Sequence, residues 1–323
     1  MEKPLNGKGE INKTPLMKKI VRHKTYYLMF LPAVILLILF SYKPMVGIVI
    51  AFKDYHPGIS IWESPWAGLK NFAFITRPDF TTVVKNTIVV TGLRMLFGFP
   101  APILLALMFN EVNAPRFKKI SQSIVYLPHF MSWIVVAYIL ESLLSPSVGL
   151  VNQIITGFGG EAVSFFTKPE YFRTIIVASS LWKETGWGTI IYLATIATID
   201  PQLHEAAMVE GANRLQRIWH ITLPSIMPTI SVLLVLNIPN LLNAGMDQIL
   251  PLTNPANLSV ADVLDTYILR NGVEQGQYAV STAVGLMSSA IKLVLLLGTN
   301  WMSIKLSGSG LWESPRRKEK VAA

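Results

Sequence analysis

Six long apolar stretches constrain this chain more than any other feature. A helix needs about 20 mainly apolar residues to cross the hydrocarbon core of a bilayer. Only 15% of the residues are charged, against roughly 25% in soluble domains. The sequence therefore predicts an all-α polytopic membrane protein with six transmembrane helices, which we place at 26–50, 86–109, 122–143, 174–199, 226–250 and 278–301.

The distribution of Lys and Arg predicts the topology. With the N-terminus inside, the cytoplasmic segments hold 17 of these residues and the outer segments hold seven, as the positive-inside rule requires. The rule places both termini in the cytoplasm. It divides the chain into a basic N-terminal segment (1–25), a six-span domain (26–301) and a basic tail (302–323). Because topology accounts for the net charge of +9, the expected surrounding is membrane lipid and not nucleic acid.

Catalytic chemistry is not expected. The chain has no cysteine, which excludes thiol catalysis and Cys-based metal sites. No G-x-x-x-x-G-K-[ST] motif occurs, so no P-loop for ATP is expected in this chain. His204-Glu205 begins like the zinc motif HExxH, but Met208 stands where the second histidine is needed. We expect neither a metal site nor an enzyme.

The most polar segment between two spans is 200–225, which the topology places in the cytoplasm. Asp200 and Pro201 suit the N-cap and first position of a helix, and Gly211 suits a turn with positive φ. Pro224 and Pro228 predict that a second short helix ends where span five begins. By itself this pattern fits a plain connector as well as a docking element.

The spacing of residues within 200–225 resembles the EAA loop of the membrane subunits of ABC importers. The matching residues are Glu205, Ala206, Ala207, Gly211, Ile221, Leu223 and Pro224. Three further stretches, 42–55, 64–72 and 182–212, are similar to sugar-type permeases. The nearest subgroup imports oligosaccharides such as alginate or pectin fragments. The similarity covers most of residues 25–301.

This resemblance implies a type I (MetI-like) ABC-importer permease in a bacterial inner membrane. The implied partners are a second homologous permease, two ATP-binding subunits that hold ATP and Mg, and an extracytoplasmic solute-binding protein. No cofactor belongs to this chain. Glu205, Ala206, Ala207 and Gly211 would form the coupling helix and its turn, and Ile221, Leu223 and Pro224 would close the motif.

Span five carries the first group of candidates for a substrate pathway. Asn237, Asn240, Asn243, Asp247 and Gln248 fall within an arc of about 140° if the helix is continuous. Polar groups inside a span are candidate functional residues, although amides also join helices by hydrogen bonds. Both readings stay open, and Pro239 among these residues favours a helix break.

Span four carries the second group, Trp182, Lys183, Glu184 and Trp187. The tryptophans are suited to stacking on a sugar ring, and the charged pair to binding hydroxyls or a carboxylate. The alternative is a buried structural charge network, which we favour for Lys183. Neighbouring side chains on a helix point about 100° apart, so Lys183 and Glu184 need not pair. Arg94 in span two has the same ambiguity.

The expected function is ATP-driven import of an oligosaccharide by alternating access. An ion-gradient-driven secondary transporter of a polar solute is the alternative. It would use Lys183, Glu184 and Asp247 as ion sites, but it leaves the spacing of residues 205–224 unexplained. Whether the saccharide is acidic or neutral stays open.

Overall fold

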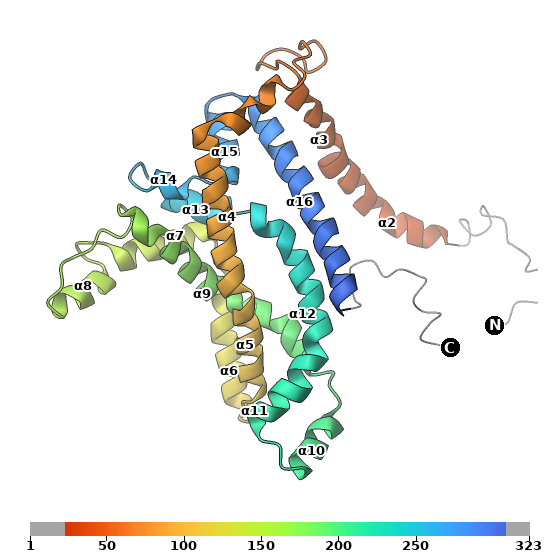
Figure 1. Ribbon diagram of the computed structural model, residues 1–323, viewed down its shortest axis with the longest axis vertical. Helices are drawn as coiled ribbons and strands as arrows, with labels where there is room; N and C mark the ends of the chain where they lie inside the picture. Colours follow the sequence, from red (N-terminus) through yellow and green to blue (C-terminus); the bar gives the residue numbers. More distant parts are fainter. Residues whose placement is uncertain (1–22, 308–323) are drawn as a thin grey trace, which may run out of the picture.

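The computed structural model describes residues 23–307, which form helices joined by loops, with one isolated β-bridge between Lys53 and Trp66 (Figure 1). Most of the two expected basic terminal segments, 1–22 and 308–323, lies outside these residues. Within the described part, four helical stretches are long and apolar enough to cross a membrane: Lys24–Phe52, Pro78–Asn110, Arg214–Leu242 and Tyr278–Lys305. A fifth candidate is a bent helix pair. These spans confirm an all-α, multi-spanning architecture.

The first span is composite, and its end packs on the bundle, where Ala51 is buried. Helix α2 (Lys24–Leu37) continues through a π-helical turn (Ile38–Tyr42) and α3 (Lys43–Met45) into a 3₁₀ segment (Val46–Phe52). The π turn comes directly before Lys43 and Pro44. None of the α2 residues is buried, and Figure 1 shows α2 inclined away from the other helices.

The second span begins eight residues earlier than expected. Helix α4 (Pro78–Gly98) has Pro78 in its first turn and Asp79 beside it, both favourable at a helix N-terminus. Helix α5 (Pro100–Asn110) follows after Phe99 alone. Pro100 divides the stretch because proline lacks the backbone N–H that a helix interior needs.

The expected third span is wrong as a single helix. Helix α6 (Pro115–Tyr126) with its 3₁₀ turn (Leu127–Phe130) meets α7 (Trp133–Leu144) at an angle of 102°. Met131 and Ser132 are extended at the corner. The Ser132 hydroxyl accepts the Val135 N–H at 3.3 Å and so starts a new helix. We call this corner the first helix break.

The expected fifth span is also wrong in its bounds. The helical stretch begins at Arg214 and continues through α11 (Arg214–Arg217), a π turn (Ile218–Thr222), α12 (Leu223–Asn237) and a 3₁₀ turn (Ile238–Leu242). It stops at Asn243–Gly245, which we call the second helix break, before α13 (Met246–Leu252). The continuous polar face expected over 237–248 is therefore divided between two helices.

Helix α9 (Pro169–Ile196) and α16 (Tyr278–Ser307) are the two longest helices among the described residues. Helix α9 contributes to two buried apolar clusters, one with α4, α7, α13 and α14 (Leu258–Ala261), the other with α5 and α12. Helix α16 packs on α4, α15 (Leu264–Leu269) and the end of the first span. Two outlying helices complete the chain, α8 (Leu150–Gly157) and α10 (Pro201–Val209).

Gly186 determines how closely α9 and α6 approach each other. A Cβ atom at this position would lie 2.1 Å from the Val125 carbonyl oxygen, a contact that no ordinary side chain makes. We expect Gly186→Ala to destabilise the purified protein by about 1–3 kcal/mol, because overpacking forces the backbones apart. A thermal melt in detergent measures the effect.

Gly92 in α4 is the matched control, because no atom lies within 4 Å of a Cβ there. Gly92→Ala should keep or raise the melting temperature, since alanine is the better helix former by about 1 kcal/mol. Equal melting temperatures for the two variants would contradict the close approach of α9 and α6.

Candidate functional site

The polar segment expected to couple to a partner projects from one end of the bundle. Asp200 caps α10, because its carboxylate accepts the Gln202 N–H at 3.0 Å, and Pro201 occupies the first turn. Glu205, Ala206 and Ala207 lie within α10. Glu205 and Ala206 are exposed and Ala207 is half-buried. Figure 1 shows α10 beyond the ends of the long helices, next to α11 at the base of the stretch that continues into α12.

A tight turn follows α10. Gly211 has a φ of +86°, in the left-handed region where a side chain is unfavourable. The Ala212 N–H donates to the Ala207 carbonyl at 2.9 Å and closes the helix end. Asn213 and Gln216 then form a reciprocal capping box at 2.9 and 2.7 Å. The sequence predicts the positive φ at Gly211 correctly.

The second half of the segment differs from the prediction. Ile221, Leu223 and Pro224 lie within the continuous helical stretch Arg214–Leu242, and Pro224 and Pro228 do not end a separate helix. The π turn Ile218–Thr222 comes just before Pro224. The seven motif residues therefore comprise a projecting helix and turn, and a second group at the base of span five.

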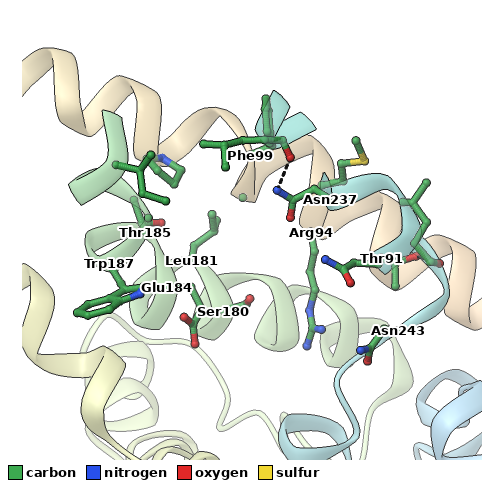
Figure 2. A pocket seen from close by; sticks show the side chains of 18 of the residues that line it. Thr91, Arg94, Phe99, Ser180, Leu181, Glu184, Thr185, Trp187, Asn237 and Asn243 are labelled. Atoms are coloured by element: carbon green, nitrogen blue, oxygen red, sulfur yellow. Dashed lines mark hydrogen bonds between the residues drawn. The ribbon is translucent and has the colours of Figure 1, made fainter. Parts of the chain in front are cut away.

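A cavity of about 500 Å³ lies between α4, α5, α9 and α12. Figure 2 shows Glu184 and Trp187 on one side of it and Arg94 and Asn243 on the other. Among the described residues, its only charged lining side chains are Arg94 and Glu184. Its other polar lining comes from Thr91, Ser180, Thr185, Tyr192, Asn237, Asn240 and Asn243.

The candidates from the sequence divide among three places. Glu184 and Trp187 from span four and all three asparagines of span five line the cavity. Asp247 instead lines a second, more open cavity of about 580 Å³ beside α15 and α16. Trp182 and Lys183 are absent from the lining of either cavity.

Arg94 reaches from α4 across the second helix break. Its guanidinium donates to the Ala244 carbonyl oxygen and to Gln248 Oε1. Gln248 Nε2 in turn donates to the Ile176 carbonyl and to Ser179 Oγ, each at 2.8 Å. The hydrogen bonds of Arg94 thus go to neutral groups and join α4, the break and α9.

Lys183 lies at the first helix break. It is 5% exposed, and its Nζ donates to the His129 carbonyl at 2.7 Å. The Lys183 ammonium also lies 3.3 Å from Glu184 Oε1 and 5.1 Å from the Trp133 ring centre. Lys183 and Glu184 therefore do pair, because flexible side chains overcome their different directions on the helix.

His129 completes this group. Its Nδ1 lies 2.8 Å from Glu184 Oε2. Its ring stacks on the Trp187 ring, with 4.5 Å between the ring centroids and an angle of 3° between the ring planes. Both oxygens of Glu184 are therefore engaged. His129 was not among the predicted site residues, because the bend that brings it to α9 lies inside a stretch whose apolar pattern predicts a single span.

The side chains that line the cavity are suited to binding a polar solute. In residues 23–307, no three His, Asp or Glu side chains lie together as a metal would require. The cavity instead combines an arginine, amides, hydroxyls and one indole, which can hydrogen-bond and stack against a polyhydroxylated solute.

The comparisons with known proteins agree with this geometry. Residues 98–306 match the family described as binding-protein-dependent transport system inner membrane component. Protein LplB of Bacillus subtilis (strain 168) is 44% identical over 297 residues, 92% of this chain and 93% of that protein. The polygalacturonan/rhamnogalacturonan transport system permease protein YteP of the same organism is 45% identical over 298 residues, which are 92% of this chain and 93% of that protein.

Two solved structures have the same fold. A crystal structure of a bacterial ABC transporter involved in the import of the acidic polysaccharide alginate has a TM-score of 0.84 and 43% identity, covering 90% of this chain and 99% of that chain. The crystal structure of a bacterial alginate ABC transporter in complex with an alginate pentasaccharide-bound periplasmic protein has a TM-score of 0.85 and 43% identity. It covers 92% of this chain and 99% of that chain. The chain therefore belongs to the binding-protein-dependent transport system inner membrane component family, the membrane-spanning permeases of ABC importers, which are transport subunits and not enzymes.

Proposed function

We propose that this permease carries an acidic oligosaccharide, of the alginate or pectin-fragment class, through the 500 Å³ cavity. The observation that carries the proposal is the charge of the cavity wall. Arg94 donates only to neutral acceptors, so its positive charge is not cancelled by a bonded carboxylate. Glu184 has one oxygen paired with Lys183 and the other with His129. The wall therefore favours a carboxylate more than a neutral ring.

The lining residues would make different contacts with such a solute. Arg94 supplies the charge for a uronate carboxylate, and Asn237, Asn240 and Asn243 supply donors and acceptors for hydroxyls. Trp187 offers an aromatic surface for a sugar ring. Two of the relatives support the acidic class, since their names give polygalacturonan and alginate as what they transport or import.

The projecting helix α10 and the turn at Gly211 are proposed to dock in an ATPase subunit. Leu203, Met208 and Val209 expose apolar surface on α10, and Val209 is 90% exposed, while Glu205 adds a charge. The stretch from Arg214 to Leu242 is helical over 29 residues and carries Asn237 and Asn240 at the cavity. The docked end directly precedes this stretch, so its movement can be transmitted to the cavity wall through one continuous helical element.

The complete importer in this proposal contains a second homologous permease and two ATPase subunits that bind ATP and Mg. An extracytoplasmic solute-binding protein delivers the saccharide. Both termini face the cytoplasm of the bacterial inner membrane, with segments 1–25 and 302–323 on either side of the domain 26–301, as the distribution of Lys and Arg favours. Membership in the family of ABC-importer permeases argues against an ion-gradient-driven transporter. Two of the ion sites that this alternative would use, Lys183 and Glu184, are paired with each other.

Replacing Arg94 tests the substrate class. We expect Arg94→Met to lower uptake of trigalacturonate by the reconstituted importer by about tenfold, the loss of one charge-assisted contact. Arg94→Lys should keep most of the uptake, because it keeps the charge. Radiolabelled uptake into proteoliposomes with saturating binding protein measures this.

Arg173 provides the matched control, since it is half-buried and also donates to a neutral group, Asn86 Oδ1, at 3.0 Å, but does not line the cavity. Arg173→Met should leave trigalacturonate uptake within about twofold of wild type. If Arg94→Met transports the acid normally, or if the wild type takes up neutral saccharides only, the acidic class is wrong.

Replacing Gly211 tests the coupling role. A leucine at a φ of +86° costs about 1–2 kcal/mol, and no atom lies within 4 Å of a Cβ there. We therefore expect Gly211→Leu to reshape the turn without disturbing the bundle. The complex should assemble, while uptake per ATP hydrolysed falls about tenfold.

The control for this variant is Gly276→Leu, at a glycine with a φ of +66° and equally open surroundings, far along the chain from the turn. It carries the same kind of backbone strain and should keep normal coupling. Saccharide-stimulated ATPase and uptake that stay in step in Gly211→Leu would remove this turn from the mechanism.

A further inference from the structure

We propose that His129, which does not itself line the cavity, is the positioning residue that makes the cavity wall acceptable to acidic saccharides. It would do so through its contact with Glu184 Oε2, which keeps that carboxylate oxygen paired. This inference rests on the proposed function, because it assumes that the saccharide passes the cavity. His129 lies in the 3₁₀ turn Leu127–Phe130 directly before the first helix break.

Two side chains of the cavity wall depend on the His129 ring. Its Nδ1–H donates to Glu184 Oε2 at 2.8 Å, which directs the carboxylate. Its face lies parallel to the Trp187 indole at 4.5 Å, and the neighbouring Phe130 meets the same indole edge-on at 5.6 Å. Trp187 thus packs against His129 and Phe130 and also lines the cavity.

The main chain of His129 has a separate role. Lys183 Nζ binds the His129 carbonyl oxygen at 2.7 Å and Glu184 Oε1 at 3.3 Å. Neither contact involves the imidazole. A substitution at position 129 therefore removes the ring contacts while the link from Lys183 to the helix break stays in place.

The two ring contacts have different consequences for a charged solute. Without the Nδ1–H donor, Glu184 Oε2 is an unpaired carboxylate oxygen facing a cavity that must admit other carboxylates. Like charges brought together in a poorly hydrated site repel strongly. Without the stack, Trp187 loses a packing neighbour but the charge of the wall is unchanged.

Two single variants separate these effects. His129→Phe keeps an aromatic ring against Trp187 and removes the donor to Glu184. His129→Asn keeps an N–H group near the position of Nδ1 and removes the stack. A third variant, His129→Phe with Glu184→Gln, removes the unpaired charge as well, and a Gln carbonyl can still accept from Lys183.

Trigalacturonate uptake by proteoliposomes with the complete importer is the readout, at saturating binding protein. We expect His129→Phe to lower the uptake about tenfold, His129→Asn to stay within about twofold of wild type, and the double variant to recover to within about twofold. His23→Phe, at the exposed start of the first span, serves as the control.

Rescue by Glu184→Gln distinguishes the charge effect from a packing effect. If His129→Phe and the double variant lose uptake equally, the loss does not come from the charge of Glu184 and the inference is wrong. It is equally wrong if His129→Phe transports the acid normally while Arg94→Met does not. If the wild-type importer does not take up trigalacturonate, the proposed function itself is wrong, and so is the inference that rests on it.

Discussion

A carbonyl oxygen left open by a helix break needs a donor from within the protein, because lipid offers none. This chain meets that need twice in the same way. Lys183 of α9 donates to the His129 carbonyl at the first break, and Arg94 of α4 donates to the Ala244 carbonyl at the second. In both cases a cation from a neighbouring long helix fixes the broken segment in place.

The cavity follows from these two contacts. Lys183 brings His129 and Glu184 to one side, and Arg94 holds Ala244, the residue after Asn243, on the other. A structural requirement of the backbone therefore places one cation in the cavity wall and neutralises the one carboxylate there. The polar character that the proposed cargo needs comes from residues that also stabilise the fold.

Some of this was predictable from the sequence and some was not. The polar helix with Asp200 at its start and Gly211 at its end depends on local rules of capping and backbone conformation, which short-range patterns express. Polar groups inside a membrane span are costly and therefore indicate candidate functional residues. Five of the predicted residues do line the cavity: Glu184, Trp187, Asn237, Asn240 and Asn243. Asp247 does not, since it follows the second break and lines the other cavity, together with Asn243.

A helix break was predicted at Pro239, and the second break directly follows the 3₁₀ turn Ile238–Leu242 that contains this proline. The first break escaped prediction, because apolar periodicity does not change at Met131–Ser132 and the donor to the His129 carbonyl comes from Lys183 of α9. For the same reason His129 was not among the predicted site residues. At Pro224 the sequence predicted a helix end that the structure does not have. Tertiary packing and a π turn accommodate this proline within a helix that a proline usually ends.

Hydrogen–deuterium exchange at the two breaks tests most directly whether the cations hold them. Lys183→Met should speed exchange of the amides around 129–133 and leave 243–248 unchanged, and Arg94→Met should do the reverse, because each removes one donor from one break. Exchange that stays at wild-type rates in both variants, or that rises equally at both breaks in either one, would contradict this account.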